Sequence, residues 1–498
     1  MKPITWFLPL AAAGLASFAA ADWQYRSRPD LAVPRLNITV PADRDLVEKG
    51  YIFVTPYEGF ADGHKGPVQP GAYIFRDDGE LVWSGLGYHS GWVANFVPDT
   101  WNGETYLRAF QGKLDGTHGR MYGYHVLLGS DYEVAKVVRA KSHRLTSAHE
   151  FRLVDEVDIE TGDVLFEWQS LDHVDPKYSA FPLDFGAGLP GSGRNETDAW
   201  NYFHINSVDK DDEGNYLLSA RNIAAIFKIN GTSGDIIWQL GGFHGGSSFQ
   251  VSPEDRFSFQ HHARFRGRSP DGSLEFISLF DNGAHSAPFK IHPFSRARYF
   301  ELDHNKGTAK ALRTFDAPDG LSAHTQGSVQ ILPNKNFFVN WGQAGAVTEF
   351  NKEGKVLFHS YLDSAPEGIF VQSYRGFRAN WTGTPSEEPA VVAFKRSDQT
   401  GLDVYASWNG DTEAASWRFY APSLDHSQDQ LLGEFERKGF ETYAELRDFS
   451  VDGEILVTAE AVDANGKVLT RTKPVVARAE VQVPLPEEFD RIFDPEEL

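Results

Sequence analysis

The 498-residue sequence contains no cysteine and only two methionines. Without thiols the chain can form no disulfide, no cysteine nucleophile and no thiolate metal site. A chain of this length can bury a large core, so it does not need a disulfide framework. Beyond the N-terminal stretch, no segment reaches the roughly 18 consecutive apolar residues that a transmembrane helix requires.

Positive charge is also scarce. The chain has 47 Lys and Arg against 69 Asp and Glu, which gives a formal net charge of −22. A surface this acidic repels nucleic acid and anionic membranes and argues against both as partners. An anionic substrate would therefore have to be attracted by a local cluster of Arg and His side chains.

The first 21 residues, MKPITWFLPLAAAGLASFAAA, have the pattern of a secretory signal peptide. Lys2 supplies the positive start, an apolar stretch follows, and Ala19 and Ala21 form a small-x-small cleavage pattern. We therefore expect a secreted, extracellular protein. Glycosylation in the secretory pathway is expected at four N-x-S/T sequons: Asn37, Asn195, Asn230 and Asn380.

Aromatic residues and glycine are plentiful, with 37 Phe, 18 Tyr, 12 Trp and 46 Gly. Helical periodicity is rare. Short alternating or apolar runs are separated by DG, NG and GD turns, a pattern typical of strands joined by tight connections. The sequence therefore predicts an all-β fold.

A repeating unit organises these strands. Residues 204–238 contain a first strand, a DEGN turn, YLLSA, AAIFKI, an NGTSG turn and DIIWQL. Residues 324–358 follow the same order over the same length. Further copies, some of them looser, start at Tyr51, Trp92, His149 and His261. Six four-stranded units in a row predict a six-bladed β-propeller. An irregular array of β-sandwiches is the alternative, but it does not explain why four units begin with His.

The unit that starts at His149 is unusually short, because it reaches Trp168 much sooner than the other units reach their last aromatic residue. We expect either that this blade lacks a hairpin after Val154 or that the sequence lacks an internal segment. After about Pro385 the pattern changes to strands of an immunoglobulin- or fibronectin-like β-sandwich with Trp408 and Trp417 in its core. The predicted organisation is a signal peptide (1–21), a propeller (22–385), a sandwich (386–480) and an acidic C-terminal tail (481–498).

The innermost strand of each blade of a propeller lines the central channel, so equivalent positions of different blades converge there. The aligned units place four histidines at one such position: His149, His204, His261 and His324, the last with Thr325 as a one-residue alternative. One histidine alone could simply be a packed core residue. Four at the same position point to a functional site, because core packing would favour Val, Ile or Phe.

Other residues join this candidate site by alignment or by strand periodicity. The ends of the second strands place Arg221, Asp281 and Gly342 at equivalent positions. Asn206 lies two residues after His204, so on a regular strand it shares the same face. His262 is adjacent to His261 and is expected to point the opposite way.

Several ordered motifs resemble the arylsulfotransferase (ASST) family, especially its fungal branch: HINSVDKDDEGNYLLSAR, IFKINGTSGDIIWQLGG, FSFQHHARF and SLFDNGAHS, with AHEFRLV before them and SWNGDTEAASWRFYA near the C-terminus. The resemblance implies a six-bladed propeller with an attached β-sandwich. It also implies a cofactor-independent transfer of a sulfuryl group from a phenolic sulfate ester to another phenol, so small aromatic molecules are the expected partners.

The resemblance also assigns roles to residues. His261 in FSFQHHARF matches the family's nucleophilic histidine, which would become a sulfohistidine. The resemblance also makes His204, Asn206, Arg221 and His149 expected catalytic residues and Thr325 an expected substrate-binding residue. Asp281, placed by the alignment of the units, is the second expected substrate-binding residue. A neutral imidazole can attack sulfur, while Arg and Asn side chains hold the sulfuryl oxygens.

Two other functions stay open at the level of sequence. One is a metal-assisted lactonase, lyase or cyclase that uses His149, His204, His261 and Asp281 as ligands, because His and carboxylates from separate strands can bind a divalent ion. The other is a propeller that binds carbohydrate or a partner without catalysis.

Overall fold

The structure, a computed structural model, describes residues 23–59, 66–139, 146–150, 164–185, 190–285, 289–363, 371–396, 400–422, 429–447 and 451–479. The predicted signal peptide, most of the short unit that starts at His149 and the predicted acidic tail lie outside the described residues. Their predictions stand untested.

The described chain is all-β, as the sequence predicts. Its helices are single 3-10 turns: η2 (Ser170–Asp172), η3 (Pro176–Tyr178), η4 (Glu196–Asp198), η5 (Arg221–Ile223), η6 (Pro253–Asp255), η7 (Pro318–Gly320) and η8 (Gly342–Ala344). None of the helices within the described ranges has the length and hydropathy to span a bilayer.

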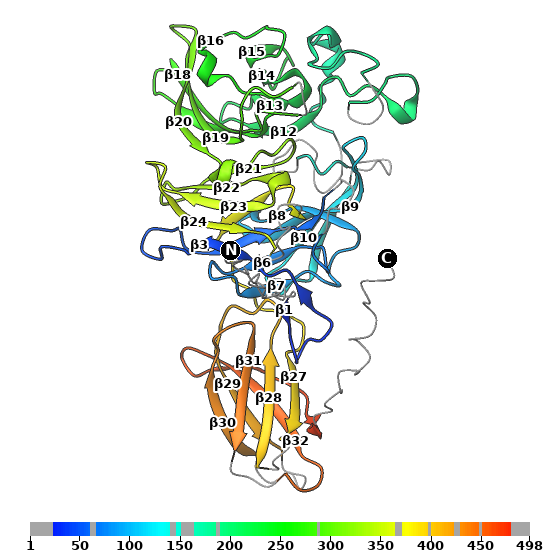
Figure 1. The fold of residues 1–498 in the computed structure, drawn as a ribbon, viewed down its shortest axis with the longest axis vertical. Helices are drawn as coiled ribbons and strands as arrows, with labels where there is room; N and C mark the ends of the chain where they lie inside the picture. Colours follow the sequence, from blue (N-terminus) through cyan, green and yellow to red (C-terminus); the bar gives the residue numbers. More distant parts are fainter. Residues whose placement is uncertain are drawn as a thin grey trace, which may run out of the picture.

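Five sheets of four or five strands occupy the part of the described chain before residue 380 (Figure 1). The first contains β26 (Gly376–Ala379), β4 (Tyr51–Val54), β6 (Tyr73–Phe75) and β7 (Leu81–Ser84). The second contains β8 (Trp92–Trp101), β9 (Glu104–Asp115), β10 (Arg120–Leu128) and β11 (Val134–Val138). The third contains β12 (Ile205–Lys210), β13 (Tyr216–Ala220), β14 (Ala225–Ile229) and β15 (Ile236–Gly241).

The remaining two sheets gain a fifth strand. The fourth contains β17 (His261–Arg268), β18 (Leu274–Asp281), β19 (Arg296–Asp303) and β20 (Thr308–Asp316), extended by the parallel strand β16 (Gln250–Val251). The fifth contains β21 (Ser328–Ile331), β22 (Phe337–Asn340), β23 (Ala346–Phe350) and β24 (Val356–Tyr361), extended by β3 (Asn37–Val40). Each of the predicted units 204–238 and 324–358 thus supplies four consecutive strands of one sheet.

The two ends of this region interlock. β3, from the start of the chain, pairs antiparallel with β24, and β26, from the far end, pairs antiparallel with β4. A second link joins β5 (Tyr57–Glu58) to β25 (Val371–Gln372). The sequence-based unit at Tyr51 was therefore incomplete, because its fourth strand comes from β26 and not from the adjacent sequence.

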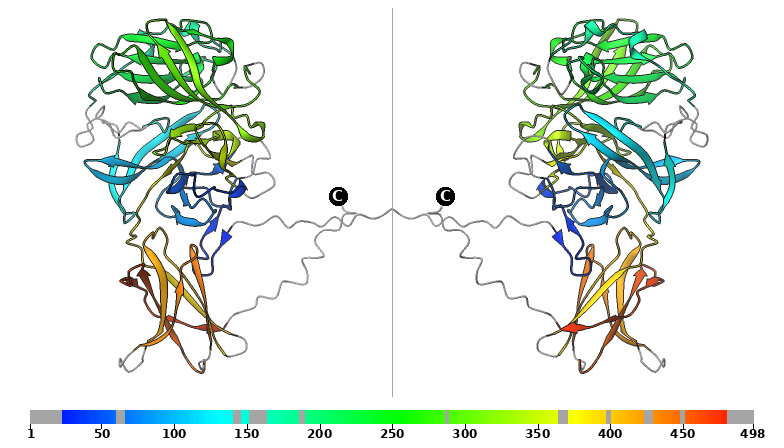
Figure 2. Two further views of the ribbon diagram at one scale, coloured as in Figure 1. Left: turned by 90° about the vertical axis from the view of Figure 1, so that its left-hand side faces the viewer. Right: turned by 90° about the vertical axis from the view of Figure 1, so that its right-hand side faces the viewer.

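The strands after residue 389 form two further sheets, which lie below the others in Figure 2. One contains β31 (Glu441–Arg447), β28 (Gly401–Ser407), β27 (Ala390–Lys395) and β35 (Arg478–Ala479). The other contains β30 (Gln430–Glu436), β29 (Ala414–Ala421), β32 (Leu456–Asp463), β33 (Val468–Arg471) and β34 (Val475–Val476). Trp408 and Trp417 lie in their shared hydrophobic core, as the sequence predicts.

The N-terminal hairpin of β1 (Trp23–Gln24) and β2 (Ala32–Val33) contacts these C-terminal sheets. The Ser27 hydroxyl donates to Glu441 Oε2 at 2.5 Å, and Arg28 Nη1 donates to Glu387 Oε1 at 2.9 Å. Of the predicted glycosylation sites, Asn37, Asn195 and Asn380 are exposed and Asn230 is half-buried.

Candidate active site

Five of the seven predicted site residues line one cavity of about 260 Å³. They come from separate parts of the chain: His149, His204 before β12, Arg221 at the start of η5, His261 at the start of β17, and Thr325 before β21. The tip of the β9–β10 hairpin, from Leu114 to Met121, supplies one wall.

Unusual backbone geometry brings these side chains together. His204, His262 and Gln326 have φ angles of 55°, 53° and 68°, in the left-handed region that side chains other than glycine seldom adopt. Next to two of them the ladder is irregular: β12 shifts register between Ile205 and Ser207, and β17 shifts between His261 and Arg264. The first strand of each of these two sheets therefore turns sharply where it reaches the cavity.

The same irregularity explains why Asn206 does not line the cavity. Two residues apart share a face only on a regular strand. Asn206 lies within the register shift of β12, and its side chain is fully buried, with Nδ2 donating to the Gln260 carbonyl at 2.6 Å. The expectation that Asn206 shares the face of His204 is therefore wrong.

Asp281 is also placed away from the cavity. Its carboxylate pairs with Arg296 Nη2 at 2.6 Å and accepts the Ser258 N–H at 3.1 Å, so it stabilises the β18–β19 region. The next residue, Asn282, contacts the candidate nucleophile instead: its Oδ1 accepts from His261 Nδ1 at 2.7 Å. The alignment therefore named the residue before the one whose side chain contacts His261.

These contacts define the state of His261. Because Asn282 Oδ1 can only accept, the imidazole carries its proton on Nδ1 and has its lone pair on Nε2. Nε2 accepts the Gln326 N–H at 3.2 Å. Burial first, and then the neighbouring Arg221 cation, hold the pKa of His261 well below its usual range, so the ring is neutral at physiological pH.

His149 and His204 form a pair beside it, with ring centroids 4.8 Å apart and the rings at 88° to each other. His204 Nδ1 accepts from Asn201 Nδ2 at 2.7 Å, which leaves the His204 proton on Nε2. Burial lowers the pKa of His149 to about 4, with Arg375 and Arg221 adding to the effect. Burial likewise holds the pKa of His204 well below its usual range. Both rings are therefore neutral, whereas a general acid at this position would have to be protonated.

Arg221 is a buried cation that forms no ion pair with a carboxylate among the described residues. Its side chain is 1% exposed, Nη1 donates to Asn222 Oδ1 and Nη2 to the His324 carbonyl, each at 2.8 Å. Within the described residues its Nε has no hydrogen-bond partner and no carboxylate forms an ion pair with it. Burial lowers the pKa of the guanidinium below its usual range. A buried charge of this kind favours an anionic ligand.

Sequence reasoning missed several other cavity residues: Tyr57, His285, Gln326, Gln343 and Tyr374. The Tyr374 side chain is 2% exposed, and its hydroxyl lacks a hydrogen-bond partner among the described residues. Burial raises the pKa of Tyr374 and keeps the phenol protonated. Tyr57 is the first residue of β5 and Tyr374 lies two residues after β25, and neither of these short strands was among the aligned ones. His285 was visible only as the histidine of the SLFDNGAHS motif.

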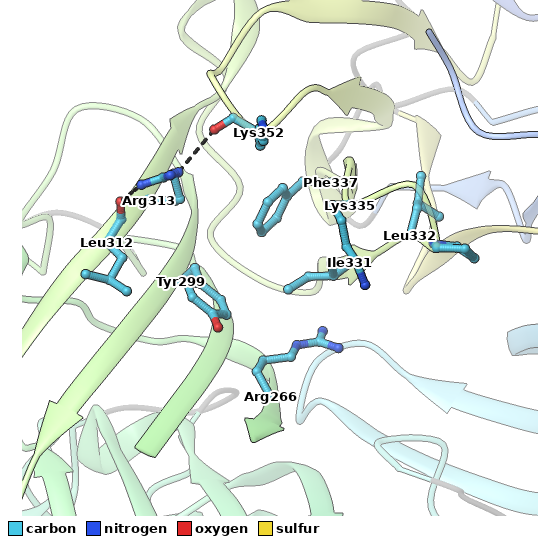
Figure 3. A pocket seen from close by; sticks show the side chains of 10 residues that line it. Arg266, Tyr299, Leu312, Arg313, Ile331, Leu332, Lys335, Phe337 and Lys352 are labelled. Atoms are coloured by element: carbon cyan, nitrogen blue, oxygen red, sulfur yellow. Dashed lines mark hydrogen bonds between the residues drawn. The ribbon is translucent and has the colours of Figure 1, made fainter. Parts of the chain in front are cut away.

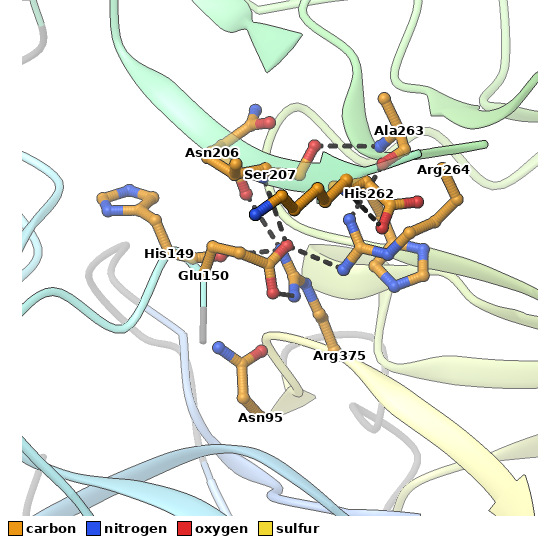
Figure 4. Close-up of polar contacts among 12 residues, drawn as sticks. Asn95, His149, Glu150, Asn206, Ser207, His262, Ala263, Arg264 and Arg375 are labelled. Carbon is orange, nitrogen blue, oxygen red and sulfur yellow. Dashed lines mark hydrogen bonds and ion pairs between the residues drawn. The ribbon is translucent and has the colours of Figure 1, made fainter. Parts of the chain in front are cut away.

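A buried ion cluster lies next to His149 (Figure 4). Glu150 accepts from Arg264 Nη2 at 2.7 Å and from Arg375 Nη1 at 3.1 Å. Arg375 Nη2 also donates to the carbonyls of His149, at 2.6 Å, and Asn206, at 2.9 Å. Burial alone would raise the pKa of Glu150, but the guanidiniums of Arg264 and Arg375 outweigh it and hold the pKa well below its usual range. The cluster fixes the backbone that carries His149.

In the described part of the chain, no three His, Asp or Glu side chains converge in an arrangement that could hold a metal ion. The metal-assisted alternative considered Asp281 as a carboxylate ligand in addition to the three histidines. That carboxylate instead pairs with Arg296.

The comparisons with known proteins bear on this region. Residues 135–362 match the arylsulfotransferase (ASST) family, and this segment contains His149, His204, Arg221, His261 and Thr325. No curated protein matches the sequence.

Similarity to solved structures is remote. The PQQ-bound aldose sugar dehydrogenase of Streptomyces coelicolor is 14% identical, with 54% of this chain and 80% of that chain covered and a TM-score of 0.22. A streptogramin B lyase is 9% identical, with 73% and 89% covered and a TM-score of 0.21. A Bacteroides caccae protein of unknown function is 12% identical, with 55% and 85% covered and a TM-score of 0.21. Scores this low carry no argument on fold or chemistry.

Proposed function

We propose that this chain is an arylsulfotransferase-like enzyme that moves a sulfuryl group from a phenolic sulfate ester to a phenol without a cofactor. The observation that carries the proposal is the buried Arg221 guanidinium, which faces a cavity of neutral imidazoles and has no carboxylate partner among the described residues. A sulfate ester supplies the missing negative charge, and its planar pair of oxygens suits the guanidinium fork. The match to the arylsulfotransferase family supports the same reaction.

In the first half-reaction the Nε2 lone pair of His261 attacks the sulfur of the donor, and the S–O bond to the aryl group breaks. The products are a sulfohistidine and a phenolate. Asn282 holds the Nδ1 proton and so keeps the lone pair on Nε2. As the substrate enters, the Gln326 N–H shifts from Nε2 to a sulfuryl oxygen, beside Arg221.

Proton transfer involves the other cavity residues. The ring of His149 is neutral, so it cannot donate a proton at physiological pH but keeps a lone pair that can accept one. The lone pair of His204, on Nδ1, already accepts from Asn201. The Tyr374 hydroxyl, protonated and unpartnered among the described residues, donates a hydrogen bond to the leaving phenolate oxygen. In the second half-reaction His149 accepts the proton of the incoming phenol, which attacks the sulfohistidine. The donor's phenol leaves as phenolate and takes a proton from solvent, and the base returns the acceptor's proton to solvent, so that protons balance over the full cycle.

The experiment is turnover of para-nitrophenyl sulfate with a phenol as acceptor. His261→Asn keeps a polar group of similar shape and is expected to release no nitrophenol while it remains folded. The exposed His244 provides a matched His→Asn control that is expected to behave as wild type. Full activity of His261→Asn would remove His261 from the reaction. A wild-type protein inactive on aryl sulfates would shift the assignment to a binding or metal-assisted function.

We further propose a closed six-bladed propeller over residues 22–385, followed by a β-sandwich over 386–480, in a secreted and glycosylated protein. The five successive sheets and the interlocked strands β3 and β26 support the propeller. The N-terminal sequence and the four sequons support secretion and glycosylation, and the sequence motifs support the fungal branch of the family.

A further inference from the structure

A cleft of about 690 Å³ lies where the first two sheets meet the segment that leads to the C-terminal sheets. Its lining residues come from four places: the start of β4, the start of β9, the β10–β11 turn and the residues after β26. They are Gly50, Tyr51, Thr105, Ser130, Asn380, Trp381 and Thr382. The last three form the sequon Asn-Trp-Thr, so one of the expected glycosylation sites is itself part of the wall of a cleft.

Other sequons have a different setting. The histidine cavity and the cavity between the fourth and fifth sheets, drawn in Figure 3, have no sequon asparagine among their described lining residues. The Oδ1 atoms of Asn195 and Asn230 accept N–H groups of their own turns, from Thr197 at 3.0 Å and from Thr232 at 2.9 Å. Asn380 is exposed, and its side chain forms no hydrogen bond within the described residues. Its Nδ2 is therefore free to carry a sugar.

Two aromatic side chains offer a packing surface inside the cleft. Trp381 and Tyr51 both line it, and both pack in one hydrophobic cluster. Trp381 is 8% exposed, and its Nε1 donates to the Tyr132 hydroxyl at 2.9 Å, which fixes the orientation of the indole. The C–H face of a pyranose ring packs well against such rings, while the exposed hydroxyls of Thr105 and Ser130 can bond to sugar hydroxyls.

The cleft also borders the connection between two groups of sheets. Residues 380–389 join β26 to β27. The Thr384 N–H donates to the Ser130 carbonyl at 2.8 Å, and the Gly383 N–H donates to Thr412 Oγ1 at 3.0 Å. The connection therefore contacts both the β10–β11 turn and the C-terminal sheets, and a group that fills the cleft would cover its first residues.

We propose that the first sugars of a glycan on Asn380 occupy this cleft, stabilise the folded chain and protect the connection from proteolysis. The inference rests on the secretion and glycosylation proposed above and not on the reaction at His261. In the transfer, Asn380 Nδ2 forms a bond to the anomeric carbon of a lipid-linked diphosphate oligosaccharide, loses one proton and displaces the lipid diphosphate. The volume of the cleft is in the range of ordinary small-molecule sites.

The test is expression of the full chain in a eukaryotic secretory host, with mass analysis of its peptides. We expect a glycan on the peptide that contains Asn380. Thr382→Ala removes the sequon but keeps the asparagine. It is expected to lower Tm by about 2 °C or more and to speed cleavage within residues 380–389 by a broad-specificity protease about fivefold or more, because proteolysis follows the population of opened chains. Thr382→Ser keeps the sequon and is expected to behave as wild type. Thr39→Ala removes the exposed sequon of Asn37 by the same substitution and should change neither quantity.

Two further measurements separate the glycan from the side chain. Trimming with an endoglycosidase that leaves one N-acetylglucosamine is expected to retain the wild-type Tm, because the first sugar is the one that packs in the cleft. Unglycosylated wild type and Thr382→Ala, both made in a bacterium, are expected to share one Tm, and a difference between them equal to that seen in the secretory host would overturn the proposal.

The mass analysis distinguishes this inference from the proposals it rests on. A bare Asn380 beside other occupied sequons would overturn this inference alone, whereas bare asparagines at every sequon would overturn it together with the proposed glycosylation. An occupied Asn380 whose loss changes neither Tm nor cleavage would also overturn it.

Discussion

At the scale of single residues, the proposed binding of a sulfate ester beside His261 depends on the planar guanidinium of Arg221. Lys at this position would keep the positive charge but lose the planar fork that can bind two sulfuryl oxygens at once. We expect Arg221→Lys to lower kcat/KM for an aryl sulfate about 100- to 1,000-fold, the usual cost of removing one preorganised donor. Arg418→Lys, on the exposed face of β29, is the matched control. A loss of less than tenfold in Arg221→Lys would contradict this role.

The pH dependence of the reaction follows from the lowered pKa of His261. A free imidazole loses its lone pair below a pH of about 6.5. Burial and Arg221 favour the neutral ring, so His261 stays a nucleophile at pH values where an exposed histidine is already protonated. We expect the acid limb of kcat/KM to lie well below pH 6.5. A profile that falls by half near pH 6.5 would show that the attacking group is not this buried ring.

The variant Asn282→Asp is expected to move the acid limb of the kcat/KM profile to higher pH. A carboxylate 2.7 Å from Nδ1 would stabilise the imidazolium and raise the pKa of His261. The acid limb should then shift to higher pH, which a purely structural role for Asn282 would not cause. Asn334→Asp, on an exposed turn, should leave the profile unchanged.

At the scale of elements, the Glu150 cluster joins β17, β26 and the segment that carries His149. Replacing Glu150 with Gln leaves two buried guanidiniums without their anion, and breaking a buried ion pair in this way costs about 3–5 kcal/mol. We expect a corresponding loss in the free energy of unfolding, measured by urea denaturation. The exposed Glu353→Gln is the control. A loss in the free energy of unfolding below about 1 kcal/mol would mean that water solvates the two guanidiniums in place of the carboxylate.

The sign of the pH effect follows from the direction of the shift. The folded state holds the pKa of Glu150 below its value in the unfolded chain. Its contribution to stability is therefore present above a pH of about 4.3 and is lost as the pH falls toward the lower folded-state pKa. The stability difference between wild type and Glu150→Gln should shrink in that acidic range.

The elements also show how far the sequence could be interpreted. Strands such as β13 were predictable to the residue, because a short and largely apolar run follows directly on the DEGN turn. The positions of the Asn206 and Asp281 side chains were not predictable. A register shift in β12 turns Asn206 away from the cavity, and the residue after Asp281, Asn282, is the one that contacts His261. Tyr374 lies outside the repeat, next to the strand that completes the first sheet, so no alignment of units could bring it into the site.

At the scale of the whole molecule, the interlocked strands decide which distant segments meet. β26 pairs with β4 although most of the described chain lies between them, and Arg375, next to β26, reaches Glu150 and the His149 carbonyl. Local sequence patterns predict strands but not which distant strand fills the gap in an incomplete sheet. The charge of the whole molecule matters as well. A molecule of net charge −22 repels an aryl sulfate overall, so cations at the site itself must attract it.

The central claim is that the cavity forms a covalent sulfohistidine on His261. The most direct measurement is mass analysis of peptides from protein incubated with an aryl sulfate in the absence of acceptor. The account predicts one sulfuryl group on the peptide that contains His261, lost on addition of a phenol and absent in His261→Asn. A sulfuryl group on another residue, or turnover without any labelled histidine peptide, would contradict it.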